Sequence, residues 1–514
     1  MDILEDLERN NMPGKLKHTP SGLLLVPQPS NNPADPLNWP LRKKIGVLSL
    51  VSLCTWIGIA QTLANQSGFF AQAKTYHKTA NELSYSASAG IAGLATGPFL
   101  WAILAQRIGR SSCIFWGLLG MLGCSVWSAS MTGRNHYIPF IISRWIGGTF
   151  GSVASTIGAG TILDLFFLHQ RGKAFAVYSV CTLFGVQFGP TLSGFIVEYA
   201  PWSIQFWWGV GAEGILAIIV FLFLEETGFS RDGKVYPTLP EGWLSNRIAT
   251  FLPGTATVPQ SKDDGRRSAK ALLFVAACPV TIVTGAVLFL AFGWAVGVVT
   301  LTSVFLGTSI EDGGYSFSPL QVACFTFVQW IGVAAAEIWG VLLNDRIPLW
   351  FTRRYCNGVW KPENRLFPLL CMPAILLPVA LGIFGAGLQY HLHYMVLGLA
   401  IFLLQLSEVS LVPVIVNYGV ECFTDYSQEV VSILNFCRLA LGLTIPFFIG
   451  EWQAAVGTAW VFGMMALFSI FAFSLAGLLA WKGDKLRSYS FASLQKLEGG
   501  VQLIDSLGPT TDAC

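Results

Sequence analysis

Five charged side chains lie in the interior of long apolar runs of this chain, where a charge is costly to keep. They are two arginines and three glutamates: Arg144, Arg438, Glu213, Glu337 and Glu408. A carboxylate removed from water can exchange a proton near neutral pH, and a nearby arginine can bias that exchange. Because lysines and histidines lie outside these runs or at their margins, proton transfer through the apolar region must rest on these residues. The alternative for each is a packing role, as a carboxylate bonded to a neighbouring helix or an arginine that reaches the membrane surface.

Neutral polar and aromatic side chains share the same runs. The polar ones are Gln61, Gln187, Gln405 and Asn435, and Trp294 adds aromatic surface. Amides form hydrogen bonds without a charge, while an indole ring offers apolar contact. We interpret this mixture as the lining of a site for an amphipathic organic molecule of moderate size. Packing against lipid or another helix is the alternative for the aromatic ring.

The overall composition indicates a membrane protein. Of 514 residues, 53% are hydrophobic and 12% are charged, whereas soluble proteins carry about 25% charged residues. So few charges could not cover the surface of soluble domains of this total length. The 31 Lys and Arg residues nearly balance the 29 Asp and Glu residues, so no basic field favours nucleic acid. The 11 Cys residues have no paired spacing, which gives no support to a disulfide framework or a metal site.

Twelve runs are apolar enough to cross a bilayer, which takes about 20 residues per helix. They fall into two groups of six, so we expect an all-α membrane protein with two six-helix halves. The runs are 45–64, 86–105, 112–131, 138–162, 174–196, 205–224, 281–306, 320–343, 367–388, 394–416, 429–449 and 457–480. The expected divisions are a tail at 1–42, a half at 43–224, a central loop at 225–271, a half at 272–481 and a tail at 482–514.

The basic residues predict an orientation, because cytoplasmic segments carry an excess of Lys and Arg. If both termini are cytoplasmic, the basic residues on the opposite side are Lys74, Lys78 and Arg134 alone. Apart from the two arginines within spans, all others then fall on the cytoplasmic side. We therefore expect both termini and the central loop in the cytoplasm.

One sequon, Asn65-Gln66-Ser67, follows the first run. In this orientation it faces the outside, where N-glycosylation takes place in organisms with a secretory pathway. Asn65 is therefore a candidate glycosylation site, although it lies very near the end of the span.

The fifth run contains the most specific pattern of the chain, Gly185-Val-Gln-Phe-Gly189-Pro190-Thr-Leu-Ser193-Gly194. The small residues at 185, 189 and 193 are four apart, so they form one groove along a helix where another helix can approach closely. Pro190 removes a backbone hydrogen-bond donor and favours a bend beside that groove.

This pattern and two others resemble signatures of the major facilitator superfamily. The loop at 102–110 reads Ala-Ile-Leu-Ala-Gln-Arg107-Ile-Gly109-Arg110. It resembles the family's Gly-x-Leu-Ala-Asp-Arg-x-Gly-Arg motif, with Ala102 and Gln106 in place of the Gly and the Asp. The stretch Arg144-Trp-Ile-Gly-Gly148 resembles Arg-x-x-Gln-Gly, and the fifth run resembles the Gly-Pro signature of drug:proton antiporters. Over residues 33–485 the chain resembles fungal twelve-span drug:proton antiporters, in a branch with polyamine transporters and secondary-metabolite exporters.

The resemblance implies roles for the candidate residues. Spans 1, 4, 7 and 10 would line a central cavity, with spans 2, 5, 8 and 11 beside it, which favours Glu408 and Glu337 over Glu213 for proton coupling. Arg144 would take part in coupling, and Arg438 would contact an anionic substrate or neutralise a carboxylate. The basic loop would latch one conformation, and the fifth span would act as a hinge. The expected unit is a monomer without cofactor or metal.

We therefore predict a proton-coupled transporter that exports a small organic compound, such as a fungal secondary metabolite, toxin or drug. Its partners would be the substrate, protons and the lipid of the plasma membrane, with the vacuolar membrane as the alternative. Uptake of a cation such as a polyamine is the first alternative function, because buried glutamates can bind amines. A nutrient sensor on a transporter scaffold is another, although the stretch after residue 480 is short for a signalling tail. An enzyme lacks support, since HExxH, GxSxG and phosphate-binding glycine motifs are missing from the sequence.

Overall fold

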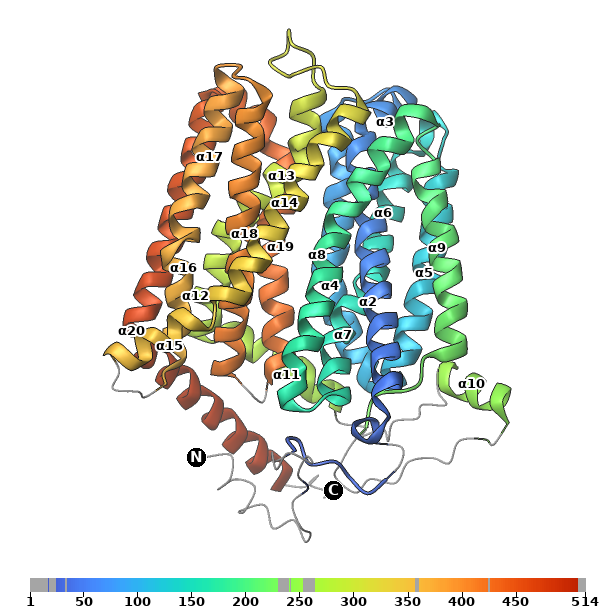
Figure 1. The fold of residues 1–514 in the computed structure, drawn as a ribbon, viewed down its shortest axis with the longest axis vertical. Helices are drawn as coiled ribbons and strands as arrows, with labels where there is room; N and C mark the ends of the chain where they lie inside the picture. Colours follow the sequence, from blue (N-terminus) through green and yellow to red (C-terminus); the bar gives the residue numbers. More distant parts are fainter. Residues whose placement is uncertain are drawn as a thin grey trace, which may run out of the picture.

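The computed structural model describes residues 17, 25–32, 35–229, 240, 242–252, 264–355, 360–423 and 426–506, with side chains except at 264–270 and 488–506. Twelve of the described helical segments are long and apolar enough to cross a membrane. The prediction of an all-α fold with twelve spans is confirmed. Figure 1 shows two bundles, α2 to α9 and α12 to α20. We call the end with α3 the upper end, and the end with α10, α11 and α15 the lower end.

The helices follow the apolar runs closely. Those of the first bundle are α2 (Leu41–Leu63), α3 (Phe69–Tyr76), α4 (Ala80–Ile108), α5 (Arg110–Ser130), α6 (Tyr137–Gly151), α7 (Val153–Leu165), α8 (Leu168–Tyr199) and α9 (Ile204–Phe223). Two lower-end helices lie between the bundles in sequence, α10 (Trp243–Phe251) and α11 (Asp264–Ala277). The second bundle has α12 (Pro279–Val287), α13 (Gly293–Gly307), α14 (Pro319–Leu343), α15 (Arg346–Tyr355), α16 (Phe367–Cys371), α17 (Pro373–Gln389), α18 (Tyr394–Cys422), α19 (Ser427–Val456) and α20 (Thr458–Ser506).

Each bundle has its own apolar core. Leu118 and Val153 belong to the main buried cluster of the first bundle, and Leu301 and Leu404 belong to that of the second. The bundles meet most extensively along two pairs of helices, α8 with α14 and α4 with α19. A change in the angle between the bundles must therefore rearrange these two contacts.

Four spans are interrupted in ways that the apolar pattern did not predict, one of them at Met372 between α16 and α17. After α2 the chain forms a 3₁₀ segment, η2 (Ala64–Gly68), before α3. The fourth span breaks at Ser152, between α6 and α7. In the seventh span a π-helical turn, η4 (Leu288–Phe292), separates α12 from α13. Hydropathy reports burial rather than hydrogen-bond pattern, and such irregular turns are frequent at functional sites.

Candidate functional site

Arg144 holds the end of α2. Its side chain is 2% exposed, and its Nη2 donates to the carbonyl oxygens of Gln61 (3.0 Å) and Thr62. These carbonyls belong to the last turn of α2, where helical C=O groups lack regular partners and the helix dipole is negative. The face of the Phe206 ring lies 4.9 Å from the guanidinium carbon and adds a cation–π contact. The charge is thus compensated inside the protein rather than at the membrane surface.

A second set of contacts connects the same glutamine to Glu213 on α9. The Gln61 amide nitrogen donates to the Phe206 carbonyl (3.2 Å) and to the Ser125 hydroxyl (3.4 Å). Ser125, on α5, donates to Glu213 Oε1 at 3.2 Å. Gln61 and Glu213 are both 0% exposed. A Cβ added at Gly209 would lie 2.3 Å from Gln61 Cδ, so only glycine leaves room for this amide. Gln61 therefore joins α2, α5, α6 and α9.

The second bundle contains another acid–arginine centre. Glu408 on α18 is 7% exposed, and its Oε2 has no hydrogen-bond partner among the described residues. Arg438 on α19 lies close enough for an electrostatic interaction with Glu408. Its Nε donates to Asn435 Oδ1 at 2.9 Å, and its Cζ lies 5.3 Å from the Phe292 ring in the π turn. The Asn435 amide donates to the carbonyl of Leu94 (3.3 Å) on α4, so this centre reaches the other bundle.

Glu337 has a partner of its own, on the other bundle. It is half-buried on α14 and accepts a hydrogen bond from the Ser179 hydroxyl of α8 at 3.3 Å, across the contact between the bundles. The two glutamates that were both favoured for proton coupling therefore have different partners, Ser179 for Glu337 and Arg438 for Glu408.

The remaining cavity candidates are also buried. Gln187 is 2% exposed and Gln405 is 3% exposed. Gln405 faces α14, because a Cβ added at Gly332 of α14 would lie 2.7 Å from the Gln405 Cβ. Trp294 is 5% exposed and packs with Trp452 and Phe468 at ring-centroid distances of 6.0 and 5.7 Å. The position of Trp294 matches the packing alternative rather than a cavity wall.

The glycines of α8 lie against two different helices. A Cβ added at Gly189 would lie 2.0 Å from the Ala60 carbonyl oxygen, and one at Gly185 would lie 2.9 Å from that of Trp56; both contacts are with α2. Gly194 instead faces α14 of the other bundle, where a Cβ would lie 2.7 Å from the Ala323 Cβ. These backbones are too close to accept any side chain. In α6, a Cβ added at Gly148 would likewise lie 2.2 Å from the carbonyl oxygen of Gly90 on α4.

The basic loop after α4 is held by acids of its own bundle. Gly109 has φ +88°, a left-handed conformation that favours glycine. Arg110 forms an ion pair with Asp164 at 2.5 Å, and its backbone N–H donates to Glu226 at 3.0 Å. Glu226 also accepts from the N–H of Ser111 at 3.1 Å, so it caps the positive end of α5. Arg107 is exposed.

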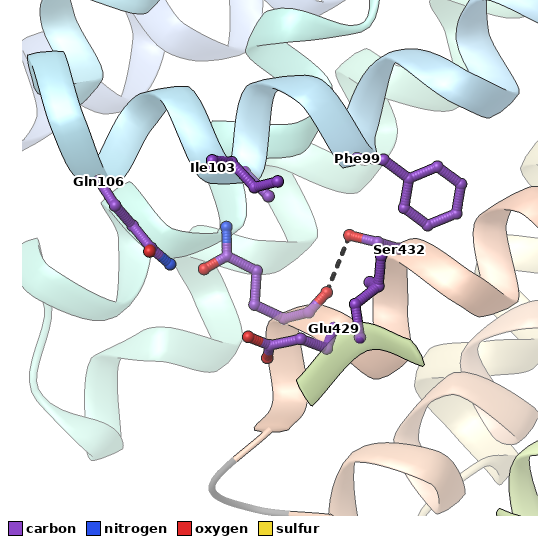
Figure 2. Close-up of a pocket in the computed structure, with 8 residues that line it drawn as sticks. Phe99, Ile103, Gln106, Glu429 and Ser432 are labelled. Carbon is purple, nitrogen blue, oxygen red and sulfur yellow. Dashed lines mark hydrogen bonds between the residues drawn. The ribbon is translucent and has the colours of Figure 1, made fainter. Parts of the chain in front are cut away.

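A shallow recess at the lower end marks where this loop's helix approaches the second bundle. Figure 2 shows Phe99, Ile103 and Gln106 of α4 facing Glu429 and Ser432 of α19. Glu429 lies in the first turn of α19, where a carboxylate is favourable. The acid of this contact therefore lies on α19, opposite the neutral Gln106. The latch expected from the loop motif stays a prediction.

Asn65 is not placed for glycosylation. It lies in η2 and is 0% exposed, and its amide nitrogen donates to the Ser86 hydroxyl at 2.6 Å. The atom that would carry a glycan is buried and bonded, so we do not propose modification there.

The contacts of Ser125 with Glu213, of Asp164 with Arg110 and of Glu226 with the start of α5 are visible only in the structure. Glu213 was visible as a buried acid, but its assignment to an outer span had ranked it last. The signal in the sequence that could have raised the rank of Glu213 is Gly209, a small residue one turn earlier in the same helix. In the structure, the Gln61 amide of another helix packs against it.

Two bundles of membrane-spanning helices with a buried charge centre in each define a class, the secondary transporters. The chain belongs to the major facilitator superfamily, whose family model matches residues 48–446. The recognition made from the sequence is thereby confirmed, and the protein is a multi-pass membrane transporter.

Similar proteins agree with this membership. The chain is 27% identical to the efflux pump radE of Floropilus chiversii, over 89% of this chain and 84% of that protein. It is 23% identical to the citrinin biosynthesis cluster MFS transporter mrr1 of Monascus ruber, over 90% of each chain. Among solved structures, a POT family transporter matches with a TM-score of 0.60 at 12% identity, over 86% of this chain and 96% of that one. The proton:xylose symporter XylE matches with a TM-score of 0.59 at 15% identity, over the same shares. At these identities the structures show the fold alone.

Proposed function

We propose that the protein is a proton-coupled exporter of a small organic compound. The observation that carries this proposal is the buried Glu408, whose Oε2 has no hydrogen-bond partner among the described residues. Such a carboxyl group gains or loses a proton without breaking a hydrogen bond at that oxygen. Arg438 responds to the change in charge of Glu408, because the two groups interact electrostatically.

The contacts of Arg438 supply a route from the proton to the conformation. An ionised Glu408 attracts the guanidinium, and protonation removes that attraction. Arg438 then repositions together with Asn435, whose amide binds the Leu94 carbonyl of the other bundle. The contact of α4 with α19 thus depends on the proton. Proton binding favours one facing state and substrate binding favours the other, so proton entry drives substrate exit.

Export of a metabolite is the direction that the relatives support. One is called an efflux pump, and another belongs to the biosynthesis cluster of citrinin. Buried amides at Gln61, Gln187 and Gln405 suit a substrate with polar groups on an apolar frame. We propose a secondary metabolite, toxin or drug as the substrate class.

The proposed arrangement places the lower end in the cytoplasm, in the plasma membrane or the vacuolar membrane. The positive-inside rule supports it, since the basic residues at the upper end, among the residues that the structure describes, are Lys74, Lys78 and Arg134. The proposed divisions stay at 1–42, 43–224, 225–271, 272–481 and 482–514, and the proposed unit is a monomer.

Uptake of a cation such as a polyamine is the second candidate. The same observation favours it, because an unpartnered carboxylate oxygen can accept a hydrogen bond from an ammonium group. No described contact favours a nutrient sensor, and we do not propose one.

Transport by purified protein in liposomes tests the proposal. An acidic lumen in neutral buffer should drive accumulation of an external amphipathic probe, for which we choose rhodamine 6G and carboxyfluorescein, while lumenal protons leave. Collapse of the gradient with a protonophore should release the probe. Accumulation of spermidine alone would favour the second candidate, and equal fluxes with and without the gradient would contradict proton coupling.

A further inference from the structure

Gln61 takes part in two sets of contacts at once. Its backbone carbonyl oxygen accepts a hydrogen bond from Arg144. Its side-chain amide nitrogen donates to the Ser125 hydroxyl, which in turn donates to Glu213. Glu213 and Arg144 also interact electrostatically. The acid on α9 and the arginine on α6 are therefore connected through the residue at which α2 ends.

The segment beyond that end reaches the other bundle. The Gln66 carbonyl accepts from the Ser303 hydroxyl of α13 at 2.6 Å, and a Cβ added at Gly307 of α13 would lie 2.4 Å from the Phe70 ring. In addition, Ser67 donates to the Pro190 carbonyl at 2.8 Å. Residues 64–76 and α13 therefore contact each other at the upper end, and we call this contact the upper gate.

We propose that Glu213 is a positioning residue that controls the upper gate through Ser125, Gln61 and Arg144. This rests on the proposed proton-coupled transport, to which it adds a second proton-responsive group in the first bundle. With Glu213 ionised, the hydrogen bonds hold Gln61 and the carbonyls that Arg144 binds, so the gate stays closed. A proton on Glu213 removes its attraction for Arg144 and turns the charge-assisted hydrogen bond from Ser125 into a weaker neutral one. The end of α2 is then held less firmly.

The surroundings of Glu213 support a response to its charge. From the helices packed around it, the charged or titratable groups that interact with it are Arg144 of α6 and Cys124 of α5. The side chain that α2 contributes to the contacts, Gln61, is neutral. Glu213 Oε2 and Gln61 Oε1 are both buried without a hydrogen-bond partner among the described residues. The unpartnered Oε2 can take up a proton without losing a hydrogen bond at that atom.

Hydrogen exchange of the backbone amides at 61–76 tests this inference without a substrate. In the unaltered protein, exchange corrected for its intrinsic pH dependence should become faster as the buffer changes from mildly alkaline to mildly acidic. Glu213→Gln imitates the protonated form, so its exchange should be faster by about tenfold in alkaline buffer and should no longer respond to pH. Ser125→Ala cuts the hydrogen-bonded connection without altering a charge and should weaken the pH response, because only the direct attraction between Glu213 and Arg144 then remains.

The control is Ser128→Ala, one turn further along α5, which removes another buried hydroxyl, bonded to Ser143. It should keep the pH response of the gate. If Glu213 has only a structural role, Glu213→Gln and Ser125→Ala should lower stability but leave the pH response of exchange unaltered. An unaltered pH response in either variant would overturn the inference. An unaltered protein without pH response at 61–76 would overturn it too. Failure of gradient-driven probe transport would instead contradict the proposed function.

Discussion

The two bundles place opposite charges in corresponding spans and surround them differently. The fourth span of the first bundle carries Arg144, which is 2% exposed and bonded to two carbonyls. The fourth span of the second carries Glu408, which is 7% exposed and has an oxygen without a hydrogen-bond partner among the described residues. Backbone carbonyls hold the Arg144 guanidinium against a helix end, whereas a carboxyl oxygen without a hydrogen-bond partner can take up a proton without losing a hydrogen bond at that atom. We infer that the first centre fixes a helix end, while the second exchanges a proton.

The partners of the two arginines differ in the same sense. Arg144 binds backbone carbonyls that cannot leave without disturbing α2. Arg438 binds the side chain of Asn435, three residues away on its own helix, and this contact can rearrange with a change of rotamer. The comparison therefore predicts that substitutions in the first centre act mainly on stability and gating, and those in the second on coupling.

Gly189→Leu should have the largest effect. Its Cβ alone would lie 2.0 Å from the Ala60 carbonyl oxygen, so α8 must move away from α2, which carries Gln61. We expect no measurable probe transport, with overpacking of about 1–3 kcal/mol or more. Transport and membrane yield should be measured together. Gly211→Leu on α9 is the matched control, because a Cβ at Gly211 meets nothing within 4 Å. Normal transport by Gly189→Leu would show that this close contact does not control the bundle.

Arg144→Ala should come next and separates the two centres. It leaves two carbonyls and Glu213 uncompensated, which we expect to cost about 3–5 kcal/mol, whereas Arg438→Ala should cost about 1–2 kcal/mol because its site is partly exposed. Thermal unfolding of the purified variants measures both. Arg144→Lys should retain part of the stability and transport, because it keeps the charge. Equal losses of stability in Arg144→Ala and Arg438→Ala would contradict the inferred difference between the two centres.

Asp164→Asn should have the smallest effect. It removes the partner of Arg110, in an ion pair about a quarter exposed, so we expect a loss of about 1 kcal/mol or less and a modest fall in transport rate. The control is Lys361→Ala, which breaks an exposed pair with Asp484. A loss of transport as complete as that of Gly189→Leu would mean that the lower loop, rather than the centres, limits switching.

Much of the fold could be predicted from the sequence. Apolar runs of span length are set by the thickness of the bilayer, which is why the twelve spans appear without any knowledge of packing. The breaks at Ala64 and Ser152 and the π turn at Leu288 could not, because they depend on which carbonyls find partners in other helices. The burial of Asn65 was hidden for the same reason.

The candidate site was only partly accessible to sequence reasoning. Arg144 and Glu408 stood out because a charge in an apolar run is rare. Their partners did not, since Ser125 and Gln61 are common residues that become informative only beside Glu213. The contact of Glu337 with Ser179 likewise depends on how α14 is rotated. The roles of these residues stay predictions.

The central claim is that Glu408 couples proton movement to transport, and one measurement tests it most directly. Glu408→Gln keeps the size and the hydrogen-bonding reach of the side chain but cannot take up and release a proton. In liposomes, we expect it to lose probe accumulation against a gradient while retaining exchange between equal pools of labelled and unlabelled probe. Glu337→Gln, the same replacement at a half-buried glutamate, should accumulate the probe. If Glu408→Gln accumulates probe as the unaltered protein does, proton coupling through Glu408 is contradicted.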